Sequence, residues 1–268
     1  MSLHIESLGR GKPLVMLHGW GMHGGIWGGA VEQLAQRHRV HCVDLPGYGY
    51  STSPSPRGRG GERSEGAGAL DAIVSVLSAH FDEPVTVCGW SLGGQVALRW
   101  AQLAPYQVSK LVLVATTPRF VQGDGWDCAM AEETLHEFSA ALLENYALTL
   151  KRFIALQVRG SEHERELLAD MRRLLFSRGE PDRVALHCGL ESLRDTDLRA
   201  QLGKIMQAAL VIAGERDTLT PPAASAYLAQ HLPNVRLVNI KGAAHVPFLS
   251  HREDFVVELN GFMKVKNN

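Results

Sequence analysis

Cysteine is scarce in this chain of 268 residues. The four cysteines, Cys42, Cys88, Cys128 and Cys188, are scattered along the chain and form no C-x-x-C pair. Such spacing is not typical of a zinc site or of a disulfide-rich secreted protein. We therefore expect buried thiols in a reducing cytoplasm and no bound metal ion.

An excess of charge of either sign is also missing. The chain has 27 Lys and Arg residues against 28 Asp and Glu residues, so nothing in its net charge of −1 favours nucleic acid or a membrane surface as a partner. No apolar stretch approaches the roughly 20 residues that cross a bilayer. The first residues, MSLHIESLGRGKP, do not have the pattern of a secretory signal. These absences predict a soluble cytoplasmic protein, which we expect to be a monomer.

Apolar runs alternate with segments of helical spacing along most of the chain. The runs are continuous, as is typical of parallel strands that helices cover on both faces. The predicted strands lie within 13–19, 39–47, 84–90, 110–118, 208–217 and 235–245, and the predicted helices within 26–37, 68–80, 92–104, 222–231 and 251–264. This order predicts an α/β fold with a mostly parallel, doubly wound sheet, whose sites form at the carboxyl ends of the strands.

Two regions interrupt this alternation. Residues 51–68 are rich in Ser, Pro, Gly and Arg (Arg57, Arg59 and Arg63 among them), which predicts a mobile surface loop. Residues 119–195 contain no convincing strand and are predicted to form several helices. We interpret them as a lid inserted into a core formed by residues 1–118 and 196–268.

The stretch CGWSLGGQ, residues 88–95, crowds glycines around one serine. It has the pattern G-x-S-x-G and lies between a predicted strand and a predicted helix, which is the context of a nucleophile elbow. Gly89 and Gly93 would leave room for a turn that is too tight for larger residues. The alternative is that Ser91 is an ordinary turn residue; the strand–turn–helix context favours a nucleophile.

A serine nucleophile needs a base, and the base needs an orienting carboxylate. In this architecture the carboxylate and then the histidine follow the serine along the chain. Asp217 in LVIAGERDTLTP and His245 in VNIKGAAHVPFLSH each follow a predicted strand. Glu215 is a rival carboxylate that comes earlier in its turn, and His251 is a rival base at the start of the last helix, where a solvated or capping role is expected.

The stretch HGWGMHGG follows the first long predicted strand. A glycine-rich turn there can point a backbone N–H into the site, so we expect an oxyanion hole formed by the N–H groups of Trp20 and Leu92. His18 opens this stretch, and we interpret it as a side chain that braces the loop through hydrogen bonds.

LHGWGMHGGIW, VDLPGYGYS, GWSLGG, GERDTLTP and GAAHVPFLSH together resemble the α/β-hydrolase superfamily from end to end. Some branches carry an aspartate nucleophile where this chain has Ser91, which disfavours dehalogenase and epoxide-hydrolase chemistry. Two further segments, RFIALQ and GLESLRDTDLR, lie in the predicted lid. Together with the motifs above, they make the chain similar to the pimeloyl-[acyl-carrier protein] methyl ester esterases of biotin biosynthesis.

This resemblance implies a serine carboxylesterase that needs no cofactor and acts on an acyl chain held by acyl-carrier protein. Ser91 would attack the methyl ester, His245 would act as base and then as acid, and Asp217 would orient His245. The products would be pimeloyl-[acyl-carrier protein] and methanol. The substrate-binding residues that it implies are Trp20, Ser91, Leu92, Phe153, Ile154, Ala155, Leu156, Gln157 and His245.

Arginines in the predicted lid are candidates for contact with the acidic carrier. Arg165 and Arg172 are seven residues apart and share one helical face. With Arg152 and Arg159 they would form a basic patch. The alternative is an exposed helix held by salt bridges, because acidic residues are interleaved with these arginines; the family likeness favours the carrier.

Other functions stay open at this point. The same three residues would serve a general short-chain carboxylesterase or thioesterase, or a carbon–carbon bond hydrolase. A non-catalytic ligand-binding protein on this fold is a further alternative, against which the complete set of Ser91, Asp217 and His245 argues.

Overall fold

The computed structural model describes residues 2–53 and 67–265. Within them, a seven-stranded sheet has the order β1-β3-β2-β4-β5-β6-β7. All neighbours pair in parallel except β1, which is antiparallel to β3. The strands are β1 (Ile5–Leu8), β2 (Pro13–Leu17), β3 (Arg39–Val43), β4 (Val85–Trp90), β5 (Val108–Val114), β6 (Ala208–Gly214) and β7 (Val235–Ile240).

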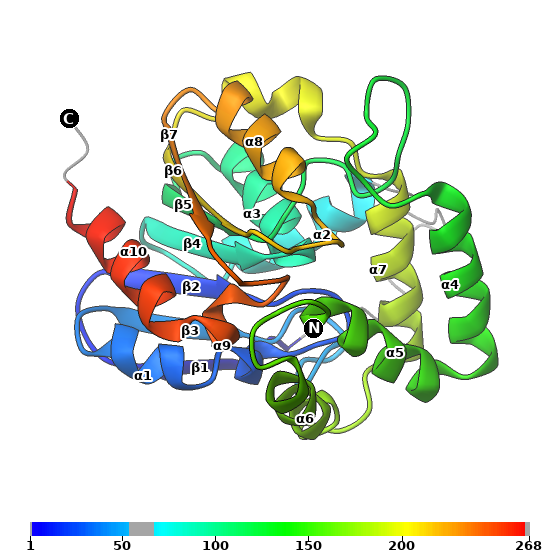
Figure 1. Cartoon of the computed structure of the whole chain (residues 1–268). Helices are drawn as coiled ribbons and strands as arrows, with labels where there is room; N and C mark the ends of the chain where they lie inside the picture. Colours follow the sequence, from blue (N-terminus) through cyan, green and yellow to red (C-terminus); the bar gives the residue numbers. More distant parts are fainter. Residues whose placement is uncertain (1, 54–66, 266–268) are drawn as a thin grey trace.

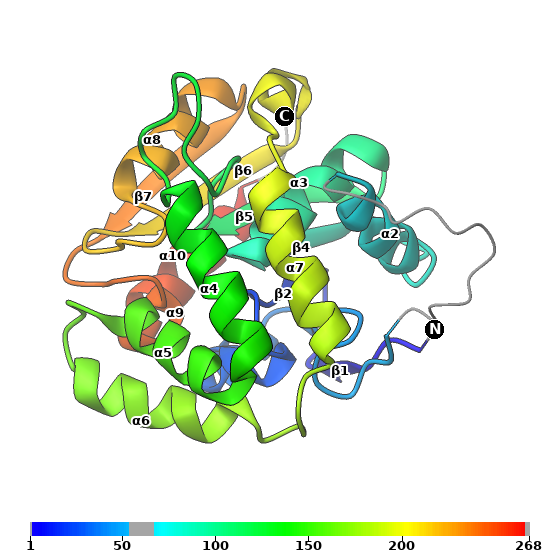
Figure 2. The same ribbon diagram turned by 90° about the vertical axis from the view of Figure 1, so that its right-hand side faces the viewer.

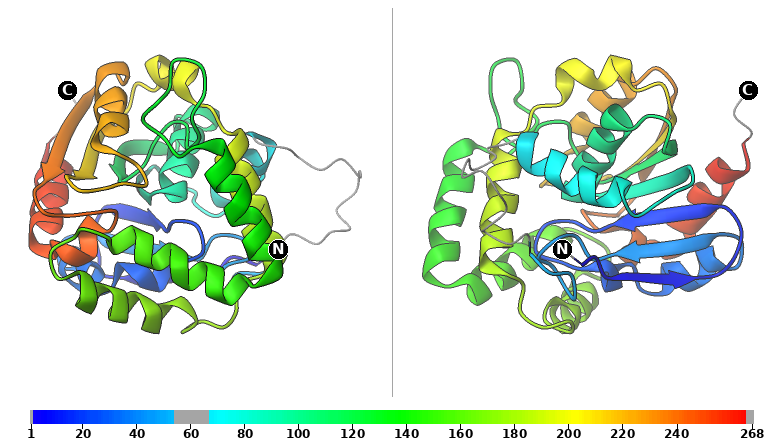
Figure 3. Two further views of the ribbon diagram at one scale, coloured as in Figure 1. Left: turned by 45° about the vertical axis from the view of Figure 1, so that its right-hand side comes forward. Right: turned by 180° about the vertical axis from the view of Figure 1, so that it is seen from behind.

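Helices cover both faces of this sheet (Figure 1). On one face α1 packs against α10, and on the other α3 packs on β4 and β5 with α2 alongside it, as the view from behind in Figure 3 also shows. The helices outside the insertion are α1 (Gly29–Ala35), α2 (Ala67–Ser78), α3 (Leu92–Leu103), α8 (Pro222–His231), α9 (Pro247–Ser250) and α10 (Arg252–Lys264), with short 3-10 helices η1 (Gly24–Trp27) and η2 (Arg199–Lys204). The predicted fold class, a mostly parallel, doubly wound sheet, is confirmed.

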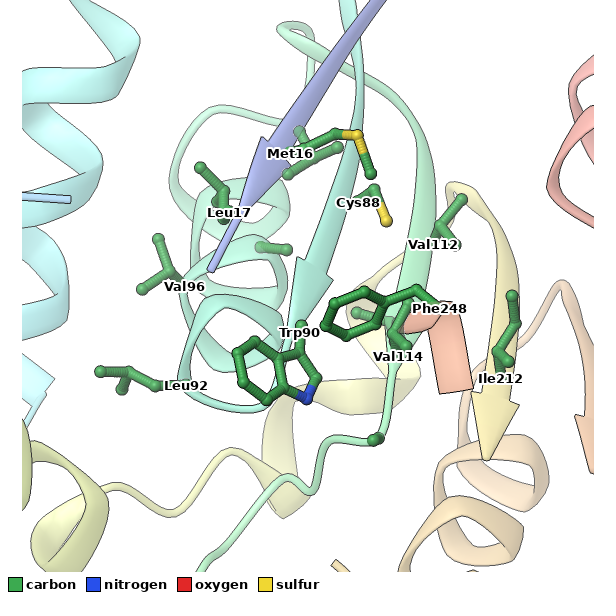
Figure 4. Packing of buried hydrophobic residues seen from close by; sticks show 14 of the residues in the cluster. Met16, Leu17, Cys88, Trp90, Leu92, Val96, Val112, Val114, Ile212 and Phe248 are labelled. Atoms are coloured by element: carbon green, nitrogen blue, oxygen red, sulfur yellow. The ribbon is translucent and has the colours of Figure 1, made fainter. Parts of the chain in front are cut away.

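The central strands are mostly apolar because they are buried on both sides. Leu14 to Leu17 of β2 have no exposed surface. The ring of Phe248, a residue of α9, packs edge-on against Trp90 at the end of β4, with 5.2 Å between ring centroids (Figure 4). Burial of such side chains is the main favourable contribution to folding.

Between β5 and β6 the chain forms α4 (Glu132–Glu144), α5 (Tyr146–Val158), α6 (Glu164–Leu175) and α7 (Arg183–Asp195). Figure 2 shows α4 and α7 side by side in front of the sheet, with α5 and α6 across the lower edge. The strands β2, β4 and β5 point their carboxyl ends towards this insertion (Figure 1). The helical insertion is therefore where the sequence predicts it.

A buried ion pair ties the insertion to the core. Arg178, between α6 and α7, donates from Nη1 to both oxygens of Asp44 at 3.0 Å, and the Asp44 side chain has no exposed surface. Asp44 also accepts the backbone N–H groups of Gly24 at 2.6 Å and Tyr50 at 2.9 Å. Burial raises the pKa of this carboxyl, but the Tyr50 N–H, the Arg178 guanidinium and other donors together hold it below its ordinary value.

Three details differ from the sequence predictions. Cys128 is only partly buried and Cys188 is exposed, so the expectation of buried thiols is wrong for both, because they lie outside the sheet core. Ser51 is buried and donates to the Asp44 carbonyl at 2.6 Å, so the predicted surface loop does not begin there. Arg57, Arg59 and Arg63 lie outside the described residues.

Among the described helices, none is long and apolar enough to span a bilayer.

Candidate active site

Ser91 stands between β4 and α3 in a conformation that L-residues rarely adopt, with φ 54° and ψ −118°. A Cβ atom on Gly89 would lie 2.2 Å from the Gly93 carbonyl oxygen, and one on Gly93 would lie 2.2 Å from the carbonyl oxygen of Leu17. The turn therefore has room only for glycine at both positions. This geometry is that of a nucleophile elbow.

Asp217 follows β6 and His245 follows β7, and the structure brings the two side chains together. The distance from His245 Nδ1 to Asp217 Oδ2 is 2.8 Å, and both side chains are buried. The other carboxylate oxygen, Oδ1, accepts the backbone N–H groups of Leu219 at 2.9 Å and Thr220 at 3.0 Å. When Nδ1 donates to Asp217, Nε2 is left with a lone pair that can accept a proton from a serine hydroxyl.

The backbone of His245 is held from two sides. Its N–H donates to the carbonyl oxygen of Gln157, near the end of α5, at 3.1 Å. Its carbonyl oxygen accepts the indole N–H of Trp90, the residue before Ser91, at 2.8 Å. The bond from Trp90 therefore joins the loop that carries His245 to the turn that carries Ser91. The sequence did not indicate either bond, because a backbone partner cannot be identified from residue types.

Two backbone amides beside the elbow, those of Leu92 and Trp20, are the predicted oxyanion donors. Leu92 is the first residue of α3, so its N–H has no partner within the helix. The Trp20 loop packs closely on the elbow, since a Cβ atom on Gly19 would lie 3.1 Å from Ser91 Cβ. Within the described part of the chain, neither the Leu92 nor the Trp20 amide has a hydrogen-bond acceptor.

His18 braces the Trp20 loop, as predicted. Its Nδ1–H donates to the Gly19 carbonyl at 2.8 Å, and its Nε2 accepts the backbone N–H of Leu45 at 2.9 Å. Complete burial lowers the pKa of His18 to about 4, so the ring is neutral at pH 7. The ring thus joins the loops that follow β2 and β3.

The rival residues serve other contacts. Glu215 accepts the backbone N–H of Gly242 at 3.0 Å, and His251 contacts the Ser250 hydroxyl at 2.9 Å. These contacts favour Asp217 and His245 as the carboxylate and the base.

An apolar pocket of about 270 Å³ lies beside the Trp20 loop, among α4, α5 and α7. Phe153 and Leu156 of α5 line it, whereas Ile154 and Gln157 are buried without lining it and Ala155 is only partly buried. The Trp20 ring contacts Phe153 and Phe138 edge-on, with centroids 5.1 and 5.6 Å apart. Phe138, on α4, was not among the predicted residues, because a single aromatic residue in a helix gives no functional signal.

Comparison with known proteins identifies the family. The model of the alpha/beta hydrolase fold family matches residues 12–252. A pimeloyl-[acyl-carrier protein] methyl ester esterase from Nitrosomonas europaea is 45% identical over 255 residues, 95% of this chain and 97% of that protein. The esterase of the same name from Nitrosospira multiformis is 41% identical over 264 residues, 98% of this chain and 99% of that protein.

The chain belongs to the pimeloyl-[acyl-carrier protein] methyl ester esterase family. Solved structures agree with this esterase family in fold. An esterase from Exiguobacterium antarcticum is 26% identical, with a TM-score of 0.86 over 98% of this chain and 96% of that one. An enol-lactonase from Burkholderia xenovorans has a TM-score of 0.82 at 20% identity, over 98% and 96% of the two chains, and shows the shared fold only.

In this member of the esterase family, the four arginines of the insertion that the sequence singles out are exposed. Arg152 is on α5 and lines the apolar pocket, Arg159 follows α5, and Arg165 and Arg172 are on α6. Across residues 2–53 and 67–265, none of the four forms an ion pair, although the neighbouring Arg173 pairs with Asp170. The alternative of a helix held by salt bridges thus finds no support at these four positions.

Proposed function

We propose that this protein hydrolyses the methyl ester of pimeloyl-[acyl-carrier protein] to pimeloyl-[acyl-carrier protein] and methanol, in biotin biosynthesis. The observation that carries the proposal is the identity of 41–45% to esterases of that name over nearly the whole chain, insertion included. The Asp217–His245 pair, whose loop is bonded to Trp90 beside Ser91, supports the proposal.

Acylation of Ser91 is the first proposed step. The hydroxyl oxygen attacks the ester carbonyl carbon while Nε2 of His245 accepts its proton, and Asp217 stabilises the imidazolium through the 2.8 Å bond. The N–H groups of Trp20 and Leu92 would donate to the oxyanion of the tetrahedral intermediate. When the intermediate collapses, His245 returns the proton to the methoxide, and methanol leaves.

Water completes the reaction. His245 takes a proton from a water molecule, whose oxygen attacks the acyl carbon, and Ser91 leaves with that proton. The balance is one ester and one water giving one acid and one methanol. Three side chains and two amides therefore suffice, and the mechanism requires no metal ion or organic cofactor.

We also propose that residues 119–195 act as a lid that positions the long substrate. The apolar pocket lined by Phe153 and Leu156 would hold methylene groups, and Arg152 at its edge, with Arg159, Arg165 and Arg172, would face the acidic carrier. Positioning of this kind would bring the distal ester, and not the carrier thioester, to Ser91. A monomer in the cytoplasm remains our prediction from the sequence.

Complementation tests the function. A biotin auxotroph that lacks this esterase should grow without biotin when it expresses the wild-type protein and should fail to grow with Ser91→Ala. The purified wild-type protein should release methanol from pimeloyl-[acyl-carrier protein] methyl ester, and Ser91→Ala should lower kcat by at least about 10⁴-fold. Soluble wild-type protein that neither complements nor releases methanol would overturn the proposal.

Charge reversal tests the carrier contact separately. Arg165→Glu and Arg172→Glu, both on α6 and outside the pocket lining, should raise KM for the carrier-bound ester and leave the hydrolysis of p-nitrophenyl butyrate unchanged, because only the carrier is acidic. Arg37→Glu is the matched control, since Arg37 is exposed on the core. An equal effect of all three variants on the carrier-bound ester would refute a specific patch.

A general short-chain carboxylesterase is the second candidate. The likeness to the Exiguobacterium antarcticum esterase, at 26% identity, favours it. Rapid hydrolysis of p-nitrophenyl butyrate without methanol release from the carrier-bound ester would select this function.

A further inference from the structure

Thr220 contacts both members of the Asp217–His245 pair. Its hydroxyl oxygen lies 2.8 Å from Asp217 Oδ2 and 3.3 Å from His245 Nδ1, and only 1% of the residue is exposed. Its backbone N–H donates to Asp217 Oδ1 at 3.0 Å. We infer that Thr220 is a positioning residue of this hydrolase, acting on His245 through the Asp217 carboxylate; this rests on the proposed ester hydrolysis.

The direction of each bond follows from the groups involved. A carboxylate only accepts, so the Thr220 hydroxyl must donate its single proton to Oδ2. The hydroxyl then has no proton for His245 and turns a lone pair towards the Nδ1–H. The short bond of that N–H is the one to Asp217 at 2.8 Å, and the 3.3 Å contact to Thr220 is secondary.

One residue thus holds both oxygens of the carboxylate. Oδ1 accepts the N–H groups of Leu219 and Thr220, and Oδ2 accepts the hydroxyl of Thr220 and the Nδ1–H of His245. A rotation of the carboxylate that moved Oδ2 away from His245 would break the hydroxyl bond as well. Hydrogen bonds to a charged group in a buried site are stronger than neutral ones, so this restraint is substantial.

Thr220 also has a fixed position of its own. Pro221 follows it and precedes the first turn of α8, and the backbone N–H of Asp217 donates to Gly214 at the end of β6. The segment from Asp217 to Thr220 is therefore a short turn held at both ends. We therefore expect the Thr220 hydroxyl to stay beside Asp217 as long as this turn is intact. A substitution of Thr220 alone then reports the effect of the hydroxyl and not of a displaced backbone.

The test compares Thr220→Val, which removes the hydroxyl at nearly constant volume, with Thr220→Ser, which keeps it. With p-nitrophenyl butyrate, Thr220→Val should lower kcat about tenfold with little change in KM, because a bond to a charged group is lost and the substrate is not touched. Thr220→Ser should stay within about threefold of wild type. Thr86→Val, a buried threonine on β4, is the control for the loss of a buried hydroxyl and should keep wild-type kcat.

The proton NMR spectrum gives a second readout that needs no turnover. The far-downfield signal of the His245 Nδ1–H should move or broaden in Thr220→Val and persist in Thr220→Ser. Wild-type kcat together with an unmoved signal in Thr220→Val would overturn the inference. If Thr220→Val does not fold, Thr220→Cys is used instead, because its thiol is only a weak donor. A lower kcat and a moved or broadened proton signal are then expected of Thr220→Cys. Failure of the wild-type protein on the carrier-bound ester alone would overturn the proposed substrate and not this inference.

Discussion

Replacing Arg178 by methionine should destabilise the fold strongly, because it leaves the buried carboxylate of Asp44 without its cation. Asp44 would lose two hydrogen bonds of 3.0 Å and keep those from Gly24 and Tyr50. Breaking a buried ion pair from one side costs about 3–5 kcal/mol, and the two remaining donors point to the lower end, about 3 kcal/mol of unfolding free energy. For a chain of this size the midpoint of thermal unfolding should fall by roughly 8 °C.

Arg178 also contacts Glu6, whose side chain is 53% exposed, and this second carboxylate provides the matched control. Glu6→Gln should cost less than about 1 kcal/mol, because water solvates that charge. The double variant Asp44→Asn with Arg178→Met should recover part of the loss, since no buried charge is then left unpaired.

Urea denaturation at several pH values completes this experiment. The pKa of Asp44 is lowered in the folded state, so its contribution to stability is present above the unfolded pKa and is lost as pH falls below about 4. The difference between wild type and Arg178→Met should therefore shrink in acid. A loss below about 1 kcal/mol at pH 7, or a difference that does not change with pH, would refute this account of the ion pair.

The remaining predictions concern the loops around Ser91. Gly93→Ala should abolish esterase activity and destabilise the fold, because its Cβ would lie 2.2 Å from the Leu17 carbonyl oxygen, whereas Gly203→Ala, with nothing within 4 Å, should be neutral in melting and activity assays. His18 has a lowered pKa of about 4, so the unfolded state binds more protons between about pH 4 and 6.5, and stability should fall as pH drops through that window. His18→Gln should flatten this part of the urea-denaturation profile; an unchanged profile would show that other groups are responsible.

The alternation of strands and helices could be predicted because it is local and repeated. A strand buried on both faces is a mostly apolar run in the sequence, as in β2, β4 and β6 and in β5 from Leu111 onwards. β1 was not predicted, since it has four residues, is mostly exposed and, among the described strands, pairs only with β3 at the edge of the sheet. A short, one-sided strand has too few apolar residues to form a pattern.

The candidate site was predictable where a motif carried it. The strained turn at Ser91 could be predicted because the same turn demands glycine on both sides. The pairing of Asp217 with His245 could be predicted because parallel strands end at the same edge of the sheet. Phe138 and the role of Thr220 could not be identified in this way, because the contacts of Phe138 with Trp20 and of Thr220 with His245 form only when the chain folds.

By itself, the sequence determined the features that depend on near neighbours: the strained elbow at Ser91, the order of strands and helices, and the turns that present Asp217 and His245. Only the tertiary structure decided which distant groups meet. Arg178 and Asp44 are 134 positions apart, and Trp90 and His245 are 155 apart. Contacts of this kind depend on how the insertion and the helices pack on the sheet, and that packing follows from the shapes of many side chains together, which no short pattern records.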